Sequence, residues 1–383
     1  MQTSKRSSVL IIDYALFAHD VAHALSQRGY SIAWLKPNTL SVATFDQACH
    51  AHQPIFLFSI NYSPELAFLC GQRGLRYVAW TVDPLPLSRL MVMEGTQRDT
   101  CFLFFHQRAA VTRFQALGFS HTYFLPLAAP QRRQPVMDAD ALKAYRCALS
   151  FVGASMLQEK EAAHQVILRC GPKSAAVLAQ LEGWLTDLAR GPADDVQFSG
   201  LMANPQWVHA GLMNLAPMLQ ITPEAWLELL DGWLAYLLRR SRVSALAQYQ
   251  LQVYGDAAWS AVSTHYRGYA NHQAQLNLIY AASAVNLDVP RVYQRDIVNM
   301  RVFDIMSCGG VVLSEWKDDL ATWFTPNAHL VLYKNSDELI AAVERLSGYS
   351  PARLQAMGQA AREAILENHQ LTHRVEVMLR TLD

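Results

Sequence analysis

Short apolar runs alternate with amphipathic stretches along residues 1–130. Each run has the length and content of a buried strand, and stretches with helical spacing follow several of them. Strands that alternate with helices predict βαβ units around a parallel sheet. The runs are VLIID, SIAWL, PIFLFSI, RYVAWTVD, CFLFFH and HTYFLPLA. Because ligands gather at the carboxyl ends of parallel strands, Asp13, Asp83 and His106, which close three of these runs, are candidate site residues.

A polar segment with two prolines, AAPQRRQP, interrupts this alternation and marks the expected domain boundary. A new strand, ALSFVG, begins at residue 148, and the strand–helix alternation continues to the end of the chain apart from one long helical stretch. In that stretch Leu, Trp and Ala recur at helical spacing, which predicts an α-helical insertion. The expected organisation is a first α/β domain over 1–130, a linker over 131–147, and a second α/β domain over 148–383 with the insertion at about 159–250.

Composition narrows the range of functions. Lysine and arginine number 32, aspartate and glutamate also number 32, and the net charge is zero, so nucleic acid is not an expected partner. The six cysteines form no C-x-x-C pair, which favours reduced thiols and a cytoplasmic protein. Asp13 interrupts the first apolar run, which argues against a signal peptide, and no apolar run is long enough to predict a transmembrane segment.

The most informative segment is NMRVFDIMSCGGVVLSE, which starts at Asn299 and reads as a helix followed by a strand. A helix N-terminus favours anions because its first backbone N–H groups lack intrahelical partners. Arg301 could bind a diphosphate there, and Asp304 could accept hydrogen bonds from ribose hydroxyls. The alternative is an ordinary crossover in which Arg301 and Asp304 form a surface ion pair.

Several further residues have two interpretations. Tyr269, in YRGY, could stack on a nucleotide base or lie in the core. Gly255, after LQVY, could let backbone approach a nucleotide or simply turn the chain. The sequence DAD (138–140) resembles a metal-binding motif, but it follows the linker and precedes a helical pattern, so we expect helix capping and no metal site.

The stretch from Gly255 to Arg374 resembles the C-terminal domain of CgeB-like glycosyltransferases (the spore maturation protein CgeB family) in the GT-B superfamily. Arg301 followed by VFDIMSCGG, the strand VVLSE, and the His369 to Arg374 helix occur in the family's order and spacing. In the first domain, WTVDP and YFLPLA are similar to segments of the same group. Asp304 stands where the family usually has Glu, and Lys160 is the nearest match to a basic residue after its Phe-Val-Gly strand.

This resemblance implies a GT-B-like fold, in which two Rossmann-like, doubly wound domains face a cleft. It also implies transfer of a sugar from a nucleotide-diphosphate donor to a hydroxyl of a protein or glycan. The second domain would hold the donor through Asn299, Arg301 and Asp304, with Tyr269, Gly255 and Lys160 nearby. No cofactor or metal is expected, because protein groups commonly neutralise the phosphates in this fold.

An inverting transferase also needs a general base for the acceptor hydroxyl. The candidates are Asp13, His19, Asp83 and His106, all near the ends of first-domain strands. Each could instead cap a helix or lie on a solvated face. Two other functions stay open: a catalytically silent protein that binds a nucleotide sugar or a protein, and a nucleotide-sugar epimerase.

Overall fold

The computed structural model describes residues 7–83, 92–131, 133–136, 138–169, 174–190, 222–294 and 297–382. The chain divides into two compact units: unit 1 comprises residues 1–131 and 368–383, and unit 2 comprises residues 132–367. Each unit is a parallel β-sheet with helices on it, so the predicted α/β class is confirmed.

The sheet of unit 1 has the strand order β2-β1-β3-β4-β5-β6, and its neighbouring strands pair in parallel. The chain runs from β1 to β2 on one side and then crosses to β3 on the other, so the topological switch point lies between β1 and β3. The strands are β1 (Ser8–Ile12), β2 (Ser31–Leu35), β3 (Pro54–Ile60), β4 (Arg76–Thr81), β5 (Cys101–Phe105) and β6 (Thr122–Phe124). All six coincide with predicted apolar runs.

Short sequence signals start several helices of unit 1. Ser41 and Thr44 form a capping box at the start of α2, and Ser63 caps α3, whose first residue is a proline. The helices are α1 (Ala18–Gln27), α2 (Val42–His52), α3 (Pro64–Gly71), α4 (Arg108–Ala116) and α17 (Leu371–Leu382).

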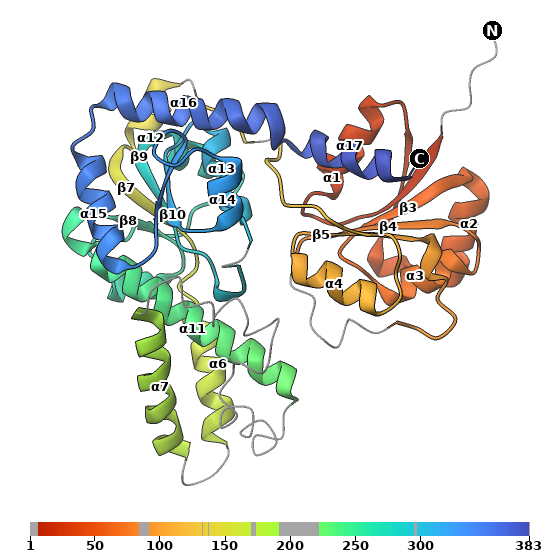
Figure 1. Cartoon of the computed structure of the whole chain (residues 1–383), viewed down its shortest axis with the longest axis horizontal. Helices are drawn as coiled ribbons and strands as arrows, with labels where there is room; N and C mark the ends of the chain where they lie inside the picture. Colours follow the sequence, from red (N-terminus) through yellow and green to blue (C-terminus); the bar gives the residue numbers. More distant parts are fainter. Residues whose placement is uncertain are drawn as a thin grey trace. The chain divides into compact units, whose positions relative to one another are not determined.

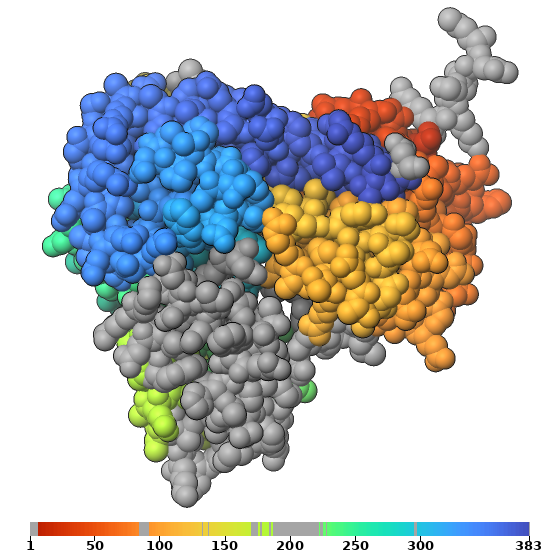
Figure 2. All heavy atoms as spheres, viewed as in Figure 1, coloured from red at the N-terminus to blue at the C-terminus, as the bar shows by residue number. Residues whose placement is uncertain are grey.

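The last helix of the chain, α17, packs on α1 and belongs to unit 1 (Figures 1 and 2). The Arg374 guanidinium anchors it, because it donates to the carbonyl oxygens of Pro126 and Leu127 at 3.0 Å. We predicted that the second domain extends to residue 383. This boundary is wrong, because residues 368–383 belong to unit 1. The physical reason is that α17 buries its apolar face, including Val375 and Met378, against unit 1 rather than against the second sheet.

The sheet of unit 2 has the order β11-β10-β9-β7-β8, again in parallel, and its switch point lies between β7 and β9. The strands are β7 (Cys147–Val152), β8 (Gln252–Tyr254), β9 (Ser283–Asp288), β10 (Val312–Glu315) and β11 (Leu330–Tyr333). The helices are α5 (Ala139–Lys143), α6 (Leu157–Leu168), α7 (Ser174–Arg190), α11 (Pro223–Ala245), α12 (Leu276–Ala282), α13 (Met300–Ser307), α14 (Asp318–Trp323), α15 (Ser336–Ser347) and α16 (Pro351–Asn368).

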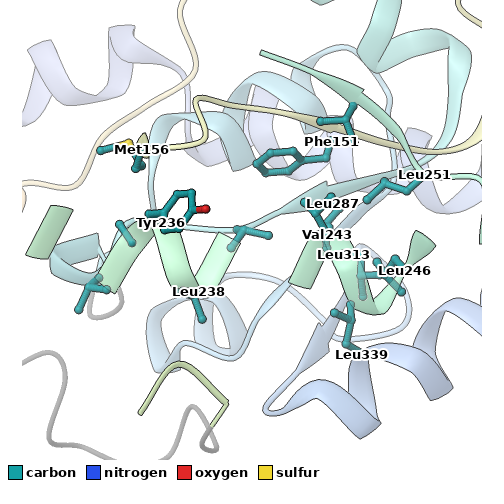
Figure 3. Close-up of a cluster of buried hydrophobic side chains, with 14 of the residues drawn as sticks. Phe151, Met156, Tyr236, Leu238, Val243, Leu246, Leu251, Leu287, Leu313 and Leu339 are labelled. Atoms are coloured by element: carbon teal, nitrogen blue, oxygen red, sulfur yellow. The ribbon is translucent and has the colours of Figure 1, made fainter. Parts of the chain in front are cut away.

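The described part of the predicted helical insertion consists of α6, α7 and α11, which pack on one another (Figure 1). The second half of α11 is not peripheral, because Leu238 and Val243 lie in the same buried cluster as Phe151 of β7 and Leu287 of β9 (Figure 3). Parallel strands need a crossover connection, and α11 lies in the connection between β7 and β8. Part of the stretch that we predicted as an insertion is therefore integral to the domain.

Candidate functional site

Asp288 ends β9 at the switch point of unit 2, and its carboxylate is fully buried. It accepts hydrogen bonds from three side chains: Asn299 Nδ2 at 3.0 Å from both oxygens, Arg301 Nη1 at 2.8 Å and Ser314 Oγ at 3.0 Å. Burial opposes ionisation, but the charges of Arg301 and Lys317 outweigh it and lower the pKa of Asp288. An ionised carboxylate thus ties β9 to the start of α13 and to β10.

Asn299 and Arg301 form the start of α13. Asn299 caps the helix by accepting from the Val302 N–H at 3.3 Å, while its amide nitrogen donates to Asp288. The Arg301 side chain is 19% exposed, so part of its guanidinium reaches the surface beside the strand ends. Arg301 therefore pairs with Asp288, and the alternative of a surface ion pair with Asp304 is wrong.

Arg239, which sequence reasoning missed, spans the switch point from α11. Its guanidinium donates to Ala154 O, after β7, at 2.7 Å and to Val289 O, after β9, at 3.2 Å. The residue is 3% exposed, and its Nε has no hydrogen-bond partner among the described residues. Burial, helped by the nearby charges of Arg301 and Arg291, lowers the pKa of Arg239 to about 9.

The charges at this edge are unbalanced. Arg239, Arg301 and Lys317 act on the buried carboxylate of Asp288, while Asp231, whose pKa burial raises to about 6, interacts with Arg239 and Arg291. Lys317 is 4% exposed, and its Nζ donates to the carbonyl oxygens of Gln294 and Ile297. Because these four cations outnumber the two carboxylates, the edge carries a positive potential that favours an anionic ligand.

Asp304 lies inside the unit rather than at its surface. It is 2% exposed, and its carboxylate is 3.1 Å from Nε of Arg133, whose Nη1 also donates to His272 O and Asn277 Oδ1. The ribose contact assigned to Asp304 stays a prediction. In the structure this carboxylate joins α13 to the segment that begins unit 2.

The other residues predicted for donor binding are spread over unit 2. Lys160 pairs with Glu182 at 3.0 Å, between α6 and α7. Tyr269 is 71% exposed and follows an isolated bridge at Tyr266, so it is not a core residue. At Gly255 an added Cβ would collide with the Gly153 carbonyl, so glycine is needed there by the close approach of two chain segments of the protein itself.

In unit 1, Asp13 and His19 lie together at the switch point. Asp13 follows β1, and its Oδ1 is 3.2 Å from Nε2 of His19 on α1. A carboxylate accepts hydrogen bonds, so Nε2 donates in this contact, and in the neutral form of the ring Nδ1 then carries the lone pair. The two side chains are 41% and 65% exposed. This pair can accept a proton from a bound hydroxyl.

Asp83, after β4, lies at the same edge of the unit 1 sheet and contacts Asn61 and Tyr14 there. Its Oδ2 accepts from Asn61 Nδ2 at 2.9 Å and from the Tyr14 hydroxyl at 3.3 Å. Asn61, after β3, also accepts from the N–H groups of Val82 and Asp83, which fixes the turn after β4. Sequence reasoning missed Asn61, although it directly follows the apolar run PIFLFSI.

His106, after β5, is 3% exposed. Its Nδ1 lies 2.9 Å from the Thr81 carbonyl oxygen, which can only accept, so Nδ1 carries the proton and Nε2 is an acceptor. Nε2 has no hydrogen-bond partner among the described residues. Burial lowers the pKa of His106 to about 4 despite the Thr81 hydrogen bond and the charge of Asp83, so the ring is neutral at pH 7.

Among the described residues, no cluster of three or more His, Cys, Asp or Glu side chains has the arrangement of a metal site. Asp138 of the DAD sequence caps α5 by accepting from the N–H groups of Asp140 and Ala141, so the capping interpretation is confirmed. None of the described helices has the length and apolar content that crossing a membrane requires.

Comparisons with known proteins agree with this architecture. Residues 236–380, which include α13 and most of unit 2 after α7, match the family model described as "Glycosyl transferase-like". No curated protein sequence matches the chain.

Solved structures resemble the chain over nearly its whole length. Sucrose-phosphate synthase from Thermosynechococcus elongatus is 13% identical with a TM-score of 0.53, covering 98% of both chains. A glycosyltransferase from Rickettsia africae is 10% identical with a TM-score of 0.53 over 99% of both chains. Anabaena HepE, solved in complex with UDP-glucose, is 10% identical with a TM-score of 0.52 over 98% of this chain and 99% of its own. The fold is that of GT-B glycosyltransferases, with two Rossmann-like units, as predicted.

Proposed function

We propose that the protein transfers a sugar from a nucleotide-diphosphate sugar to a hydroxyl group of an acceptor. Three observations support the proposal: the GT-B fold, the glycosyl transferase-like match over residues 236–380, and the cationic edge of the unit 2 sheet. A fold alone hosts many functions, so the third observation carries most weight.

The donor diphosphate would bind at the switch point of unit 2. The partly exposed guanidinium of Arg301 is already oriented by Asp288, and fork-shaped guanidinium groups bind phosphates bidentately. Behind it, the buried charges of Arg239 and Lys317 would stabilise the diphosphate as it leaves. Asp304 is proposed as a residue that supports α13 beside the ribose. Tyr269, whose ring is exposed, is proposed as a contact for the base.

The acceptor would bind at the switch point of unit 1, and His19 would be the base. The acceptor oxygen forms a bond to the anomeric carbon, the bond from that carbon to the diphosphate oxygen breaks, and the hydroxyl proton passes to Nδ1 of His19. Asp13 would stabilise the resulting imidazolium. Asp83 and His106 are proposed as groups that position the acceptor and the side chains around it.

Further features belong to the same proposal. Transfer would not need a metal ion, because the cations of the unit 2 edge replace it. Kinship with CgeB-like glycosyltransferases and a cytoplasmic location are proposed from the sequence motifs and the cysteine pattern.

The donor site is tested by calorimetry with UDP and GDP on an Arg301→Met variant. Loss of a charge-assisted bidentate contact costs about 1.5 to 3 kcal/mol, so affinity should fall about ten- to a hundred-fold. The matched control is Arg353→Met, which removes an exposed cation from α16, where Arg353 lies over the Tyr349 ring. Equal affinities for wild type and Arg301→Met would show that the diphosphate does not bind at Arg301.

A further inference from the structure

Six residues that contacts or the backbone link in series lie at the carboxyl edge of the unit 1 sheet: Asp13, Tyr14, His19, Trp34, Asn61 and Asp83, here called the first-sheet ledge. The ring centroids of Trp34 and His19 are 4.5 Å apart, and His19 contacts Asp13. Tyr14, next to Asp13 in sequence, contacts Asp83, which contacts Asn61. The ledge thus extends across the ends of β2, β1, β3 and β4.

Trp34 is the apolar end of this ledge. It is the penultimate residue of β2, is paired in register with Ile11 of β1, and is 39% exposed. Tyr14 is 38% exposed. Covering the face of an exposed aromatic side chain with a ligand removes apolar surface from water, which favours binding. The electron-rich face also attracts the weakly positive C–H groups of a ligand ring.

The other end of the ledge consists of hydrogen-bonding groups. Asp13 and Asp83 offer carboxylate oxygens, which accept hydrogen bonds from hydroxyls, and Asn61 offers an amide. An aromatic face beside several fixed acceptors matches a molecule with an apolar C–H face and a rim of hydroxyl donors.

We infer that the acceptor is a saccharide, whose ring stacks on Trp34 while its hydroxyls bind Asp13 and Asp83. This inference rests on the proposed function, since it names the substrate class of the proposed acceptor site. It places the reacting hydroxyl beside His19, which contacts both the Trp34 ring and the Asp13 carboxylate.

The test is ligand-observed NMR with maltotriose, cellotriose and chitotriose as saccharide probes and a serine-rich peptide as the protein-acceptor probe. At least one trisaccharide should bind wild type with a dissociation constant in about the millimolar range. Trp34→Ala should weaken it at least about tenfold, and Trp34→Phe, which keeps an aromatic face, should retain most of it. Trp316→Ala is the matched control, because Trp316 in unit 2 is 37% exposed but has its indole N–H bonded to Asp318 and Lys334 over its ring.

UDP titrated into the same samples separates this inference from the proposed function. UDP should bind wild type and both Trp34 variants equally, because its proposed site lies in unit 2 and Trp34 lies in unit 1. Failure of UDP to bind wild type would contradict the proposed donor site and leave the saccharide result to stand alone. Binding of the peptide but of no trisaccharide, or trisaccharide binding that survives Trp34→Ala, would overturn the inference.

Discussion

Asp288 illustrates how a buried charge is stabilised at the end of a strand. Transfer of a carboxylate out of water is costly unless its oxygens are paired and hydrogen-bonded. Here an amide and a guanidinium from the start of α13 and a hydroxyl from β10 satisfy both oxygens. The same carboxylate fixes the orientation of Arg301, so the cost of ordering a flexible arginine is met before any ligand arrives.

The buried ring of His106 should make the stability of the protein depend on pH. The pKa of its ring is about 4 in the folded protein, against 6.5 for the unperturbed group. The unfolded chain therefore binds more protons between these values, and stability that is fully present above pH 6.5 falls as the pH drops towards 4. Between pH 6.5 and pH 4, the loss in the free energy of unfolding that this difference in pKa causes is about 3 kcal/mol.

The check is the free energy of unfolding, measured with denaturant at several pH values from 4 to 7, for wild type and His106→Asn. Asparagine can still donate to the Thr81 carbonyl but does not titrate in this range. Its curve should be flatter than that of wild type over the window between the two pKa values. His369, whose pKa burial also lowers to about 4, leaves a residual slope in both proteins. Parallel curves would contradict the account of His106.

Among the elements, α13 links the proposed donor site to the core. Its N-cap, Asn299, acts in two ways at once, as a helix cap and as a donor to Asp288. Aspartate caps helices as well as asparagine does. Asn299→Asp would therefore keep the cap but place a second carboxylate against Asp288, and the free energy of unfolding should fall by at least about 2 kcal/mol.

The matched control for this prediction is Asn335→Asp at the start of α15. Asn335 caps that helix by accepting from the Glu338 N–H at 2.9 Å, and within the described part of the chain it contacts no buried carboxylate. Its stability should change by no more than about 0.5 kcal/mol. Similar losses for both variants in denaturant unfolding would indicate that capping alone, and not the contact with Asp288, explains the effect.

Strands and helix starts could be predicted well because their signals are local. Apolar runs located the strands of both sheets, and Asp138 was expected to cap a helix and does so. The Ser41 and Ser63 caps were not predicted, although their signals are equally local. The partners of charged residues could not be predicted in this way. Asp304 and Arg133 are far apart in sequence, and the periodicity of α13 says only that Asp304 lies one turn from Arg301. Arg239 looks like any basic residue of a long helix.

For the whole molecule, the main error concerned the end of the chain. Residues 371–382 have a helical pattern that fits either unit, and only the three-dimensional contacts of Arg374 with the Pro126–Leu127 carbonyls assign them to unit 1. The strand order was also beyond the sequence, since parallel strands of similar composition are interchangeable in pattern. Yet the strand order creates the switch point in each unit. It places Asp13 and Asn61 at the ends of the neighbouring strands β1 and β3, and it places Asp288 near Arg239.

The measurement that tests the central claim most directly is acceptor-dependent release of nucleoside diphosphate. The whole chain is incubated in EDTA with UDP-, GDP- and dTDP-sugars, with and without the trisaccharides, and both the released nucleotide and the mass of the saccharide are followed. We predict that one donor releases its nucleoside diphosphate faster when a saccharide is present, that the saccharide gains one sugar, and that His19→Ala slows this release by about a hundredfold or more. Interconversion of the donor sugar without an acceptor, or binding of donor with no release under any condition, would contradict the account.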